Sequence, residues 1–405
     1  MPTATASASP GAPTPSASPS ATVSPTPSPP AVPDPNLSLN LSLDKKATVS
    51  VSLASGAVSA RFRTKVAKRR PVSLQRKVDG VWIQIATSRM SASGRVSFRA
   101  GTYQQDSVYR AVELPFRIKK KLAPARATKT FGWNLTLGDS FDGQQLDEEK
   151  WLNLASGARG PRYCSQSLPE MSALSGGALV GSVDYEKDSA VVSLIEGKAR
   201  KAQEVEGRPV AGCDAGHTEN QRGVFRTSMI STRNRAIVNT GTSGMVAARV
   251  KLPESQGMHG AVWLQSINRG ELDMVEGFGY GRGISNYIHT ASKKTLAATG
   301  KARYKLGAYV KGSSTRKRSW WSRYHTYSMA WDSTGFTFRV DGSVSQRVKI
   351  RPGNVDYYLV LSLLVSDWEA YRITNPVRTK GFKDVTPAQL PEQMLVDWVR
   401  VWKRA

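Results

Sequence analysis

The stretch "ARVKLPESQGMHGAVWLQSINRGELDMVEGFG", residues 248–279, carries the pattern that decides how the second half of this chain folds. Apolar and polar residues alternate through it, first up to a proline-containing turn, then through a tryptophan-bearing run, and finally through a run of acids. Alternation with a period of two places every second side chain on one face of a β-strand. The stretch therefore predicts a strand, a turn, a second strand with Trp263 and a third strand with the acids.

Three carboxylates fall within six positions of the third strand, at Glu271, Asp273 and Glu276. Glu271 and Asp273 are two apart and share a face, whereas Glu276 on a regular strand would point the other way. One extra residue in a β-bulge at Met274-Val275 would return Glu276 to the face of the other two. The pattern is short, so a charged edge strand that arose by chance is the ordinary alternative.

Three carboxylates on one face suit the hydrolysis of a glycosidic bond with retention of configuration. That reaction needs two carboxyl groups about 5–5.5 Å apart, one to attack the anomeric carbon and one to protonate the leaving oxygen. Neighbouring carboxylates repel each other, which raises the pKa of at least one of them. A raised pKa is what a general acid requires at neutral pH, so we expect one here.

The rest of residues 131–405 also alternates at period two, with strand candidates at 324–331, 335–342, 357–365 and 392–402. No long helical periodicity stands out, and no apolar run approaches the ~20 residues that a membrane helix needs. Strands of this number, separated by glycine-rich turns, predict an all-β domain built as one large sandwich or jelly roll.

The N-terminal third divides into three parts. Residues 1–35 are almost entirely Ser, Thr, Ala and Pro, which predicts a disordered linker. Residues 36–122 contain six short alternating runs with turns between them and resemble the small immunoglobulin-like β-sandwich modules of bacterial surface and secreted proteins. Residues 123–130 are expected to be a second linker. Although no signal peptide is visible, this composition predicts a secreted or cell-wall-associated protein.

The chain is strongly basic, with a formal net charge of +26. Residues 36–130 hold 20 Lys and Arg against 4 Asp and Glu, a net charge of +16. This excess either keeps the protein soluble or docks residues 36–122 on an anionic cell-wall or matrix polymer. A nucleic-acid partner is disfavoured because no recognised binding motif or stacking run accompanies the charge. If the module is separate, a chain without residues 1–122 keeps its catalysis.

Several motifs in order, "DSFDGQQLDEEKW", "GMHGAVW", "GELDMVEGFG", "NYIHT" and "MLVDWVRVW", make residues 131–405 resemble glycoside hydrolase family 16, the laminarinase, agarase and carrageenase superfamily. The resemblance implies a concanavalin A-like jelly roll with an open cleft for polysaccharide. It implies a retaining monomeric enzyme that needs no cofactor, with Glu271 as nucleophile, Glu276 as general acid/base and Asp273 assisting between them.

The bulged spacing resembles the laminarinase side of the family, which implies β-1,3- or mixed-linkage glucan as substrate. A galactan or an acidic or sulfated polysaccharide is the alternative. Transglycosylation uses the same glycosyl-enzyme intermediate as hydrolysis. A non-catalytic carbohydrate-binding protein on this fold also remains an alternative, although such a protein has no need of a general acid.

A glycan site needs aromatic and polar side chains, and the resemblance supplies Trp263, His289 and Trp368 as candidates for substrate binding. Two further candidates are Trp321, in a stretch that combines aromatics with cations, and His259, just before the tryptophan-bearing strand. Trp263 is expected to be the sugar platform, and His289 is expected close to the acid/base. The bland alternatives are a core tryptophan for Trp263, a buried histidine for His289, and a solvated basic loop around Trp321.

The remaining expectations concern a metal ion, two cysteines and one departure from the family. In some relatives a structural calcium ion is bound in the region that corresponds here to Asp139 and Asp397. Cys164 and Cys213 would pair in an exported protein, stabilising it by roughly 4 kcal/mol, and would be two thiols in a cytosolic one. Many relatives have a glutamate where this chain has Ala247 or Ala248, in a region expected to flank the cleft.

Overall fold

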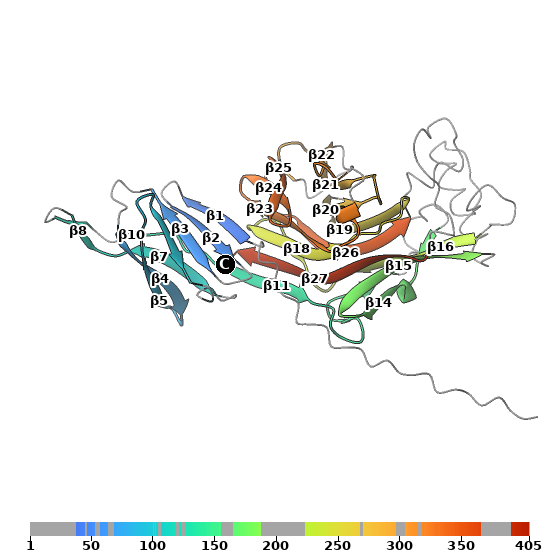
Figure 1. Ribbon diagram of the computed structural model, residues 1–405, viewed down its shortest axis with the longest axis horizontal. Helices are drawn as coiled ribbons and strands as arrows, with labels where there is room; N and C mark the ends of the chain where they lie inside the picture. Colours follow the sequence, from blue (N-terminus) through green and yellow to red (C-terminus); the bar gives the residue numbers. More distant parts are fainter. Residues whose placement is uncertain are drawn as a thin grey trace, which may run out of the picture.

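The computed structural model shows an all-β protein whose two parts lie end to end in Figure 1, with β1–β10 at one end and the larger part at the other. Two short 3-10 turns are the only helical elements among the described residues, and none has the length of a membrane span. The structure describes residues 38–404 except for 45–46, 53–56, 64–68, 100, 102, 104–106, 119–120, 124–125, 155–164, 188–222, 268–269, 297–303, 314–317 and 366–389.

The N-terminal part consists of two four-stranded antiparallel sheets. One contains β1 (Ser38–Asp44), β2 (Ala47–Ser52), β3 (Val58–Phe62) and β6 (Arg95–Phe98), in that order. The other has the order β10 (Arg126–Ala127), β7 (Val108–Glu113), β4 (Pro71–Val78) and β5 (Val81–Arg89). A small hairpin, β8 (Phe116–Ile118) and β9 (Lys121–Ala123), projects from the end. The six strands expected from the alternating runs are confirmed, and the immunoglobulin-like label stays a prediction.

The stretch that we expected to be a free linker, 123–130, is partly built into this sheet. Arg126 and Ala127 pair with β7, and the backbone N–H of Thr128 donates to the carbonyl of Ala111. Just beyond it, Tyr109 and Phe131 exchange both of their backbone hydrogen bonds. From Arg126 to Phe131 the connection is therefore hydrogen-bonded to β7. The predicted N-terminal linker, 1–35, lies outside the described residues.

The larger part is a jelly-roll sandwich of two sheets, which we call the site sheet and the back sheet. The site sheet has the order β22 (Tyr304–Tyr309), β21 (Ile284–Thr290), β20 (Glu271–Gly277), β19 (Met258–Ser266), β26 (Asp356–Val365) and β16 (Gly223–Ser231). The short strands β12 (Leu152–Asn153), β13 (Ser165–Ser167) and β17 (Val238–Asn239) extend its edge at β16 and β26.

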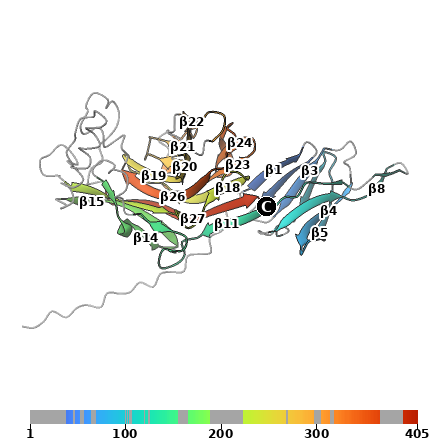
Figure 2. The ribbon, with the colours of Figure 1, turned by 180° about the vertical axis from the view of Figure 1, so that it is seen from behind.

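The back sheet is centred on the long strand β27 (Glu392–Arg404). Its neighbours on one side are β18 (Gly244–Lys251), β23 (His325–Asp332), β24 (Gly335–Val340) and β25 (Ser343–Val348). On the other side it pairs with β11 (Trp133–Asp139) and with β15 (Ala178–Lys187), which in turn pairs with β14 (Ser172–Ser175). Because β15 also pairs with β16, the two sheets are joined at that edge. Figure 2 shows the same two layers from behind.

The main core lies between the site sheet and the back sheet. Val246, Ala248 and Val250 of β18 face it from one side, and Leu272 and Ile288 face it from the other, all fully buried. The strand candidates of the sequence, including those at 324–331, 357–365 and 392–402, are confirmed as β23, β26 and β27. Each large apolar side chain buried in this way contributes about 1.5–3 kcal/mol.

A second core joins the two parts of the protein. On the outer face of the back sheet, Met245, Ala247, Trp398 and Trp402 are buried in one apolar cluster with residues of β2, β3, β4, β6 and β7. The hydroxyl of Tyr103 accepts a hydrogen bond from the backbone N–H of Trp133 at 2.8 Å across the same junction. The N-terminal part therefore packs on the outer face of the back sheet, and the two parts bury this second core between them.

The departure from the family at Ala247 and Ala248 lies in the back sheet, so the expectation that this region flanks the site is wrong. Ala247 faces the N-terminal part and Ala248 faces the core between the sheets. The neighbouring Arg249 donates to Asp397 at 2.6 Å. Residue alternation along β18 places none of these side chains on the face of the site sheet that carries the acids.

Candidate active site

The bulge predicted in the acidic strand is present in β20. Asp273 pairs with Tyr287 and Glu276 pairs with Ser285, so three steps along β20 match two along β21. Met274 and Val275 are both buried in the core between the sheets. As a result Glu271, Asp273 and Glu276 all lie on the opposite, outer face of the strand, which confirms this prediction.

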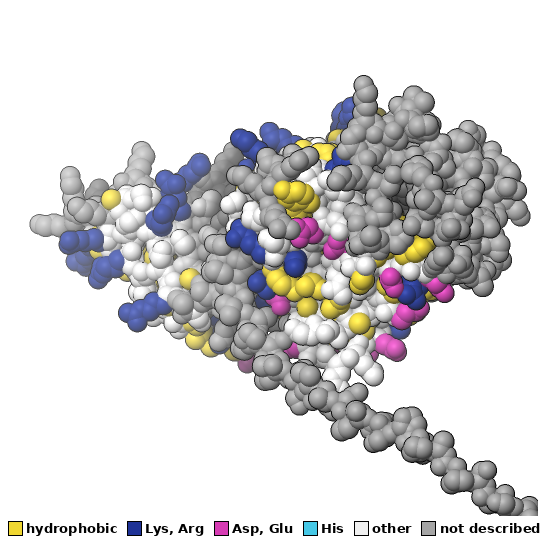
Figure 3. Space-filling view, turned by 45° about the vertical axis from the view of Figure 1, so that its right-hand side comes forward, with side chains coloured by type: hydrophobic (Ala, Val, Ile, Leu, Met, Phe, Trp, Pro, Cys, Tyr) yellow, Lys and Arg dark blue, Asp and Glu magenta, His cyan; other side chains and the backbone are white. Residues whose placement is uncertain are grey.

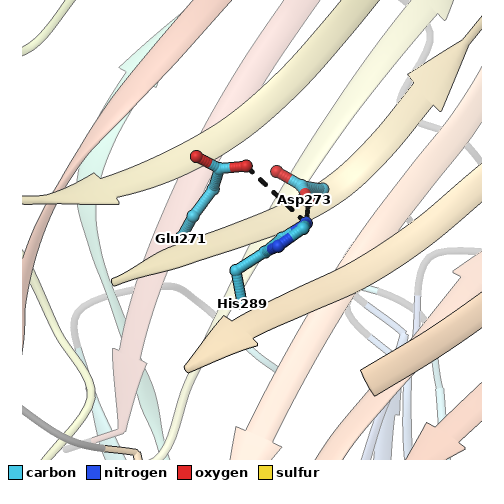
Figure 4. A group of neighbouring side chains, drawn as sticks. All are labelled: Glu271, Asp273 and His289. Atoms are coloured by element: carbon cyan, nitrogen blue, oxygen red, sulfur yellow. Dashed lines mark ion pairs between the residues drawn. The ribbon is translucent and has the colours of Figure 1, made fainter. Parts of the chain in front are cut away.

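Glu271, Asp273 and His289 converge on this face, as Figure 4 shows. His289 Nε2 lies 3.2 Å from Asp273 Oδ2 and 3.8 Å from Glu271 Oε1. The Asp273 residue is only 2% exposed, whereas the Glu271 side chain is 35% exposed. Glu271 is thus the carboxylate with the freest access for a substrate, and Asp273 is held below the surface by the histidine.

The expected place of His289 beside the acid/base is wrong. Backbone pairing puts His289 directly opposite Glu271. Of the three acids along β20, Glu271 is the one farthest in sequence from Glu276. The histidine that contacts Glu276 is His259, near the start of β19, whose Nε2 lies 3.1 Å from Glu276 Oε1. The ring of His259 stacks on Phe278, with 4.8 Å between ring centroids, which holds it in place. Sequence distance hides this contact because β19 and β20 run antiparallel.

The environment of Glu276 lowers its pKa below the ordinary value. Burial acts to raise the pKa, but the hydrogen bond and charge of His259, the hydroxyl of Ser285 at 3.0 Å and the charge of Lys305 together outweigh it. The expectation of a raised pKa is therefore wrong for Glu276 in the free protein. Hydrogen bonds and opposite charges favour the ionised form of a carboxyl and so oppose the effect of neighbouring acids. At Glu276 the contact is with His259.

Replacing His259 by Phe is expected to raise the pKa of Glu276. The substitution removes the donor to Oε1 while burial, which disfavours the charged form, remains. Carbon-13 NMR titration of the glutamate carboxyls, with Glu276→Gln used to assign the resonance, measures the shift. His259→Gln retains a donor and should move the pKa less than His259→Phe. Equal titration curves for wild type and His259→Phe would contradict this account.

Trp263 lies on the same face as the acids. It is half-buried in β19, directly opposite Asp273, and its indole Nε1 donates to Ser362 Oγ at 3.1 Å. Tyr287 and Tyr309, on β21 and β22, line the face on the other side of the acids. The sequence analysis did not single out these tyrosines. Tyr287 could have been found, because it is two residues before His289 and so shares its face.

Trp321 does not line the site, and its assignment to substrate binding is corrected. The residue is completely buried and belongs to the core between the sheets. A Cβ at Gly277 would be 3.2 Å from its ring carbon Cζ3, so the indole packs against the strand immediately after Glu276. The alternative of a solvated loop is also wrong for this side chain. Trp368, Cys164 and Cys213 lie outside the described residues.

The residues predicted to hold calcium do not fit that ion. Asp139 accepts hydrogen bonds from the Phe141 backbone and the Trp151 indole, and Asp397 is paired with Arg249. Both carboxylates thus have donors of their own. In the part of the chain that the structure describes, the metal-like grouping of side chains is instead Glu271, Asp273 and His289, whose ligand atoms lie within 4.8 Å of one another.

Residues 217–400, which contain every acid and histidine of this face, match the family model of glycosyl hydrolases family 16. The match covers somewhat less than half of the chain and lies within its larger part. This matched part is a glycoside hydrolase, and its three carboxylates lie on β20, between β19 and β21.

Individual relatives of the chain are distant. A β-glucanase of Rhodothermus marinus is 22% identical over 312 residues, which are 70% of this chain and 89% of that protein. Among solved structures, the laminarinase catalytic domain of Thermotoga maritima is 16% identical with a TM-score of 0.46, covering 67% of this chain and 98% of its own. The endo-β-1,3-glucanase of Pyrococcus furiosus is 17% identical with a TM-score of 0.46, covering 72% and 98%.

Proposed function

We propose that this enzyme is an endo-acting retaining hydrolase of β-linked polysaccharide. Of the candidate substrates, β-1,3- or mixed-linkage glucan is the one we favour. The observation that carries the proposal is the bulge in β20, which brings Glu271, Asp273 and Glu276 to one face. Two carboxyl groups on one face, with a third between them, suit a double displacement.

In the first step Glu271 attacks the anomeric carbon and forms a glycosyl-enzyme ester, while Glu276 gives a proton to the leaving oxygen. Because His259 and Glu276 are in hydrogen-bond contact, they titrate as a pair, and a proton on the pair can reach the leaving oxygen through Glu276. His289 Nε2 lies 3.2 Å from Asp273 Oδ2 and 3.8 Å from Glu271 Oε1. Asp273 therefore holds His289, and His289 orients Glu271.

In the second step Glu276 removes a proton from water, and the resulting hydroxide releases the sugar from Glu271. A lowered pKa favours this half of the cycle, because the carboxylate is ready to accept a proton once the first product has left. The anomeric carbon is inverted twice, so the product keeps the substrate's configuration.

Proton NMR of the first products tests the mechanism. Incubation with laminarin, lichenan, agarose and carrageenan, with products sized, identifies the polymer, and the anomeric signal before mutarotation reports the stereochemistry. We expect β-configured oligosaccharides from a glucan. An initial α-anomer would contradict the retaining mechanism, and longer products than substrates would identify transglycosylation instead.

Replacing Trp263 by Ala is expected to raise KM for the polymer by roughly tenfold, equivalent to ~1.4 kcal/mol of binding, because a sugar ring loses its apolar platform. Trp321→Ala is the matched control within the same fold. That change empties a core position and should lower the free energy of unfolding by about 3–5 kcal/mol. Its KM, measured well below the unfolding temperature, should be unchanged. If the KM of Trp263→Ala equals that of the wild type, Trp263 is not a platform for a sugar ring.

The place of action is also a proposal. A secreted or wall-associated enzyme suits a polymeric substrate and the Ser/Thr/Pro-rich residues 1–35. In Figure 3 several Lys and Arg side chains lie over the end formed by β1–β10, and others lie over the larger part, where the acidic side chains are also seen. Contact of residues 36–122 with an anionic wall or matrix polymer is consistent with this distribution.

A further inference from the structure

Five side chains form one row across the site sheet. Backbone pairing aligns Tyr358 of β26 with Gln265 of β19, then with Glu271, His289 and Lys305 of the next three strands. Directly paired residues point to the same face of a sheet. Neighbouring strands are about 4.8 Å apart, so the two ends of the row are about 19 Å apart. A polymer bound across the strands at Glu271 passes along this row.

Each end of the row has a cation. The Lys305 Nζ lies 3.9 Å from the ring centroid of Tyr287, and the guanidinium carbon of Arg233 lies 5.9 Å from that of Tyr358. Contact with an aromatic ring holds each charge over the face. At β22 this contact depends on Gly307, because a Cβ there would be 2.6 Å from Tyr287 Cδ1.

No acid other than the three of β20 stands on β19, β20, β21 or β22. His259 and His289 contact those acids directly, whereas Lys305 and Arg233 each lie over an aromatic ring. The charge of Lys305 nevertheless reaches the catalytic carboxyl. Burial acts to raise the pKa of Glu276, and Lys305 is among the groups that lower it. A neutral sugar gains little from such cations, whereas an anionic substituent forms charge-assisted hydrogen bonds with them.

We infer that the site takes β-linked polysaccharide whose sugars carry anionic groups, carboxylates or sulfate esters, on both sides of the cleaved bond, with Lys305 and Arg233 as the residues that bind them. This inference rests on the proposed hydrolysis of β-linked polysaccharide, and it puts an anionic polymer in place of the neutral glucan named there. Lys305 stands at one end of the row and Arg233 lies over Tyr358 at the other, with Glu271 between them in the strand order. The charged groups therefore flank the cleaved bond and do not lie at it.

The experiment compares two polymers of matched length, a soluble β-1,3-glucan and its carboxymethylated derivative. The full chain with Glu271→Gln binds without turnover, and calorimetry at low and high salt measures Kd for each polymer. Into this background go Lys305→Met, Arg233→Met and both together. Lys129→Met, an exposed cation of the N-terminal part, is the matched control with the same loss of charge.

We expect the charged polymer to bind more tightly than the neutral one at low salt, with the difference shrinking at high salt. Lys305→Met and Arg233→Met should each raise the Kd of the charged polymer about threefold, and the double variant should raise it about tenfold. The Kd of the neutral polymer should stay within twofold of the parent value in every variant. The Kd of the charged polymer for Lys129→Met should also stay within twofold of the parent value.

Equal affinity for the two polymers, or unchanged affinity in the double variant, would overturn the inference. A loss of the same size from Lys129→Met would assign the charge preference to the whole protein and overturn it as well. Hydrolysis of the neutral polymer by wild type is measured separately. The proposed function therefore survives if the neutral glucan is cleaved while the charge preference is absent, and it fails if no β-linked polymer of either kind is cleaved.

Discussion

Glu271→Gln is expected to lower kcat by a factor on the order of 10⁴ while the protein folds normally. The amide has nearly the same shape as the carboxylate but cannot attack the anomeric carbon. The Glu271 side chain is 35% exposed, so the change to an amide of the same shape should cost little folding free energy. Release of reducing ends measures the activity, and circular dichroism with thermal unfolding measures the fold.

Two further variants separate a nucleophile from a residue that merely shapes the site. Glu148→Gln makes the same chemical change at an exposed position outside the site and should leave kcat unchanged. Glu271→Ala leaves room for azide, which should restore cleavage of an activated glycoside and leave an azide on the anomeric carbon. Turnover above a few per cent by Glu271→Gln would remove Glu271 from the nucleophile's role.

A chain that begins after residue 122 is expected to lose most of its soluble, folded protein. Removing the N-terminal part uncovers Met245, Ala247, Trp398 and Trp402 on the outer face of the back sheet. An exposed apolar patch of this kind favours aggregation. This outcome differs from the expectation of a separable module, because sequence alone does not show that the two parts share a core. Soluble yield, gel filtration and Tm measure it.

A point substitution tests the same junction without deleting the module. Trp402→Ala should lower the free energy of unfolding by about 3–5 kcal/mol, because it empties a site that is almost completely buried. Removal of residues 1–35 alone is the control and should leave Tm unchanged. A truncated chain that is soluble and unfolds at the wild-type Tm would show that the junction adds nothing to stability.

Much of the site was predictable because its information is local. The spacing of Glu271, Asp273 and Glu276 requires one extra residue to keep the acids on one face, and the apolar pair Met274-Val275 is where the bulge occurs. The direction of a side chain relative to its own strand depends only on position along that strand.

The contacts between strands were not predictable in the same way. The resemblance placed His289 close to Glu276, but His289 lies opposite Glu271 and His259 contacts Glu276, because pairing register decides which acid each histidine meets. Trp321, in a basic and apparently polar stretch, is buried because Gly277 leaves space for its ring.

The sequence alone was enough to predict an all-β chain, six strands of the N-terminal part and the common face of the three acids. The pairing of histidines with carboxylates, the place of β18 in the back sheet, and the positions of Lys305 and Arg233 toward opposite ends of one row became known only from the folded structure. The physical reason is that alternation sets the inside and outside of each strand, whereas register and sheet order depend on contacts between residues far apart in the chain.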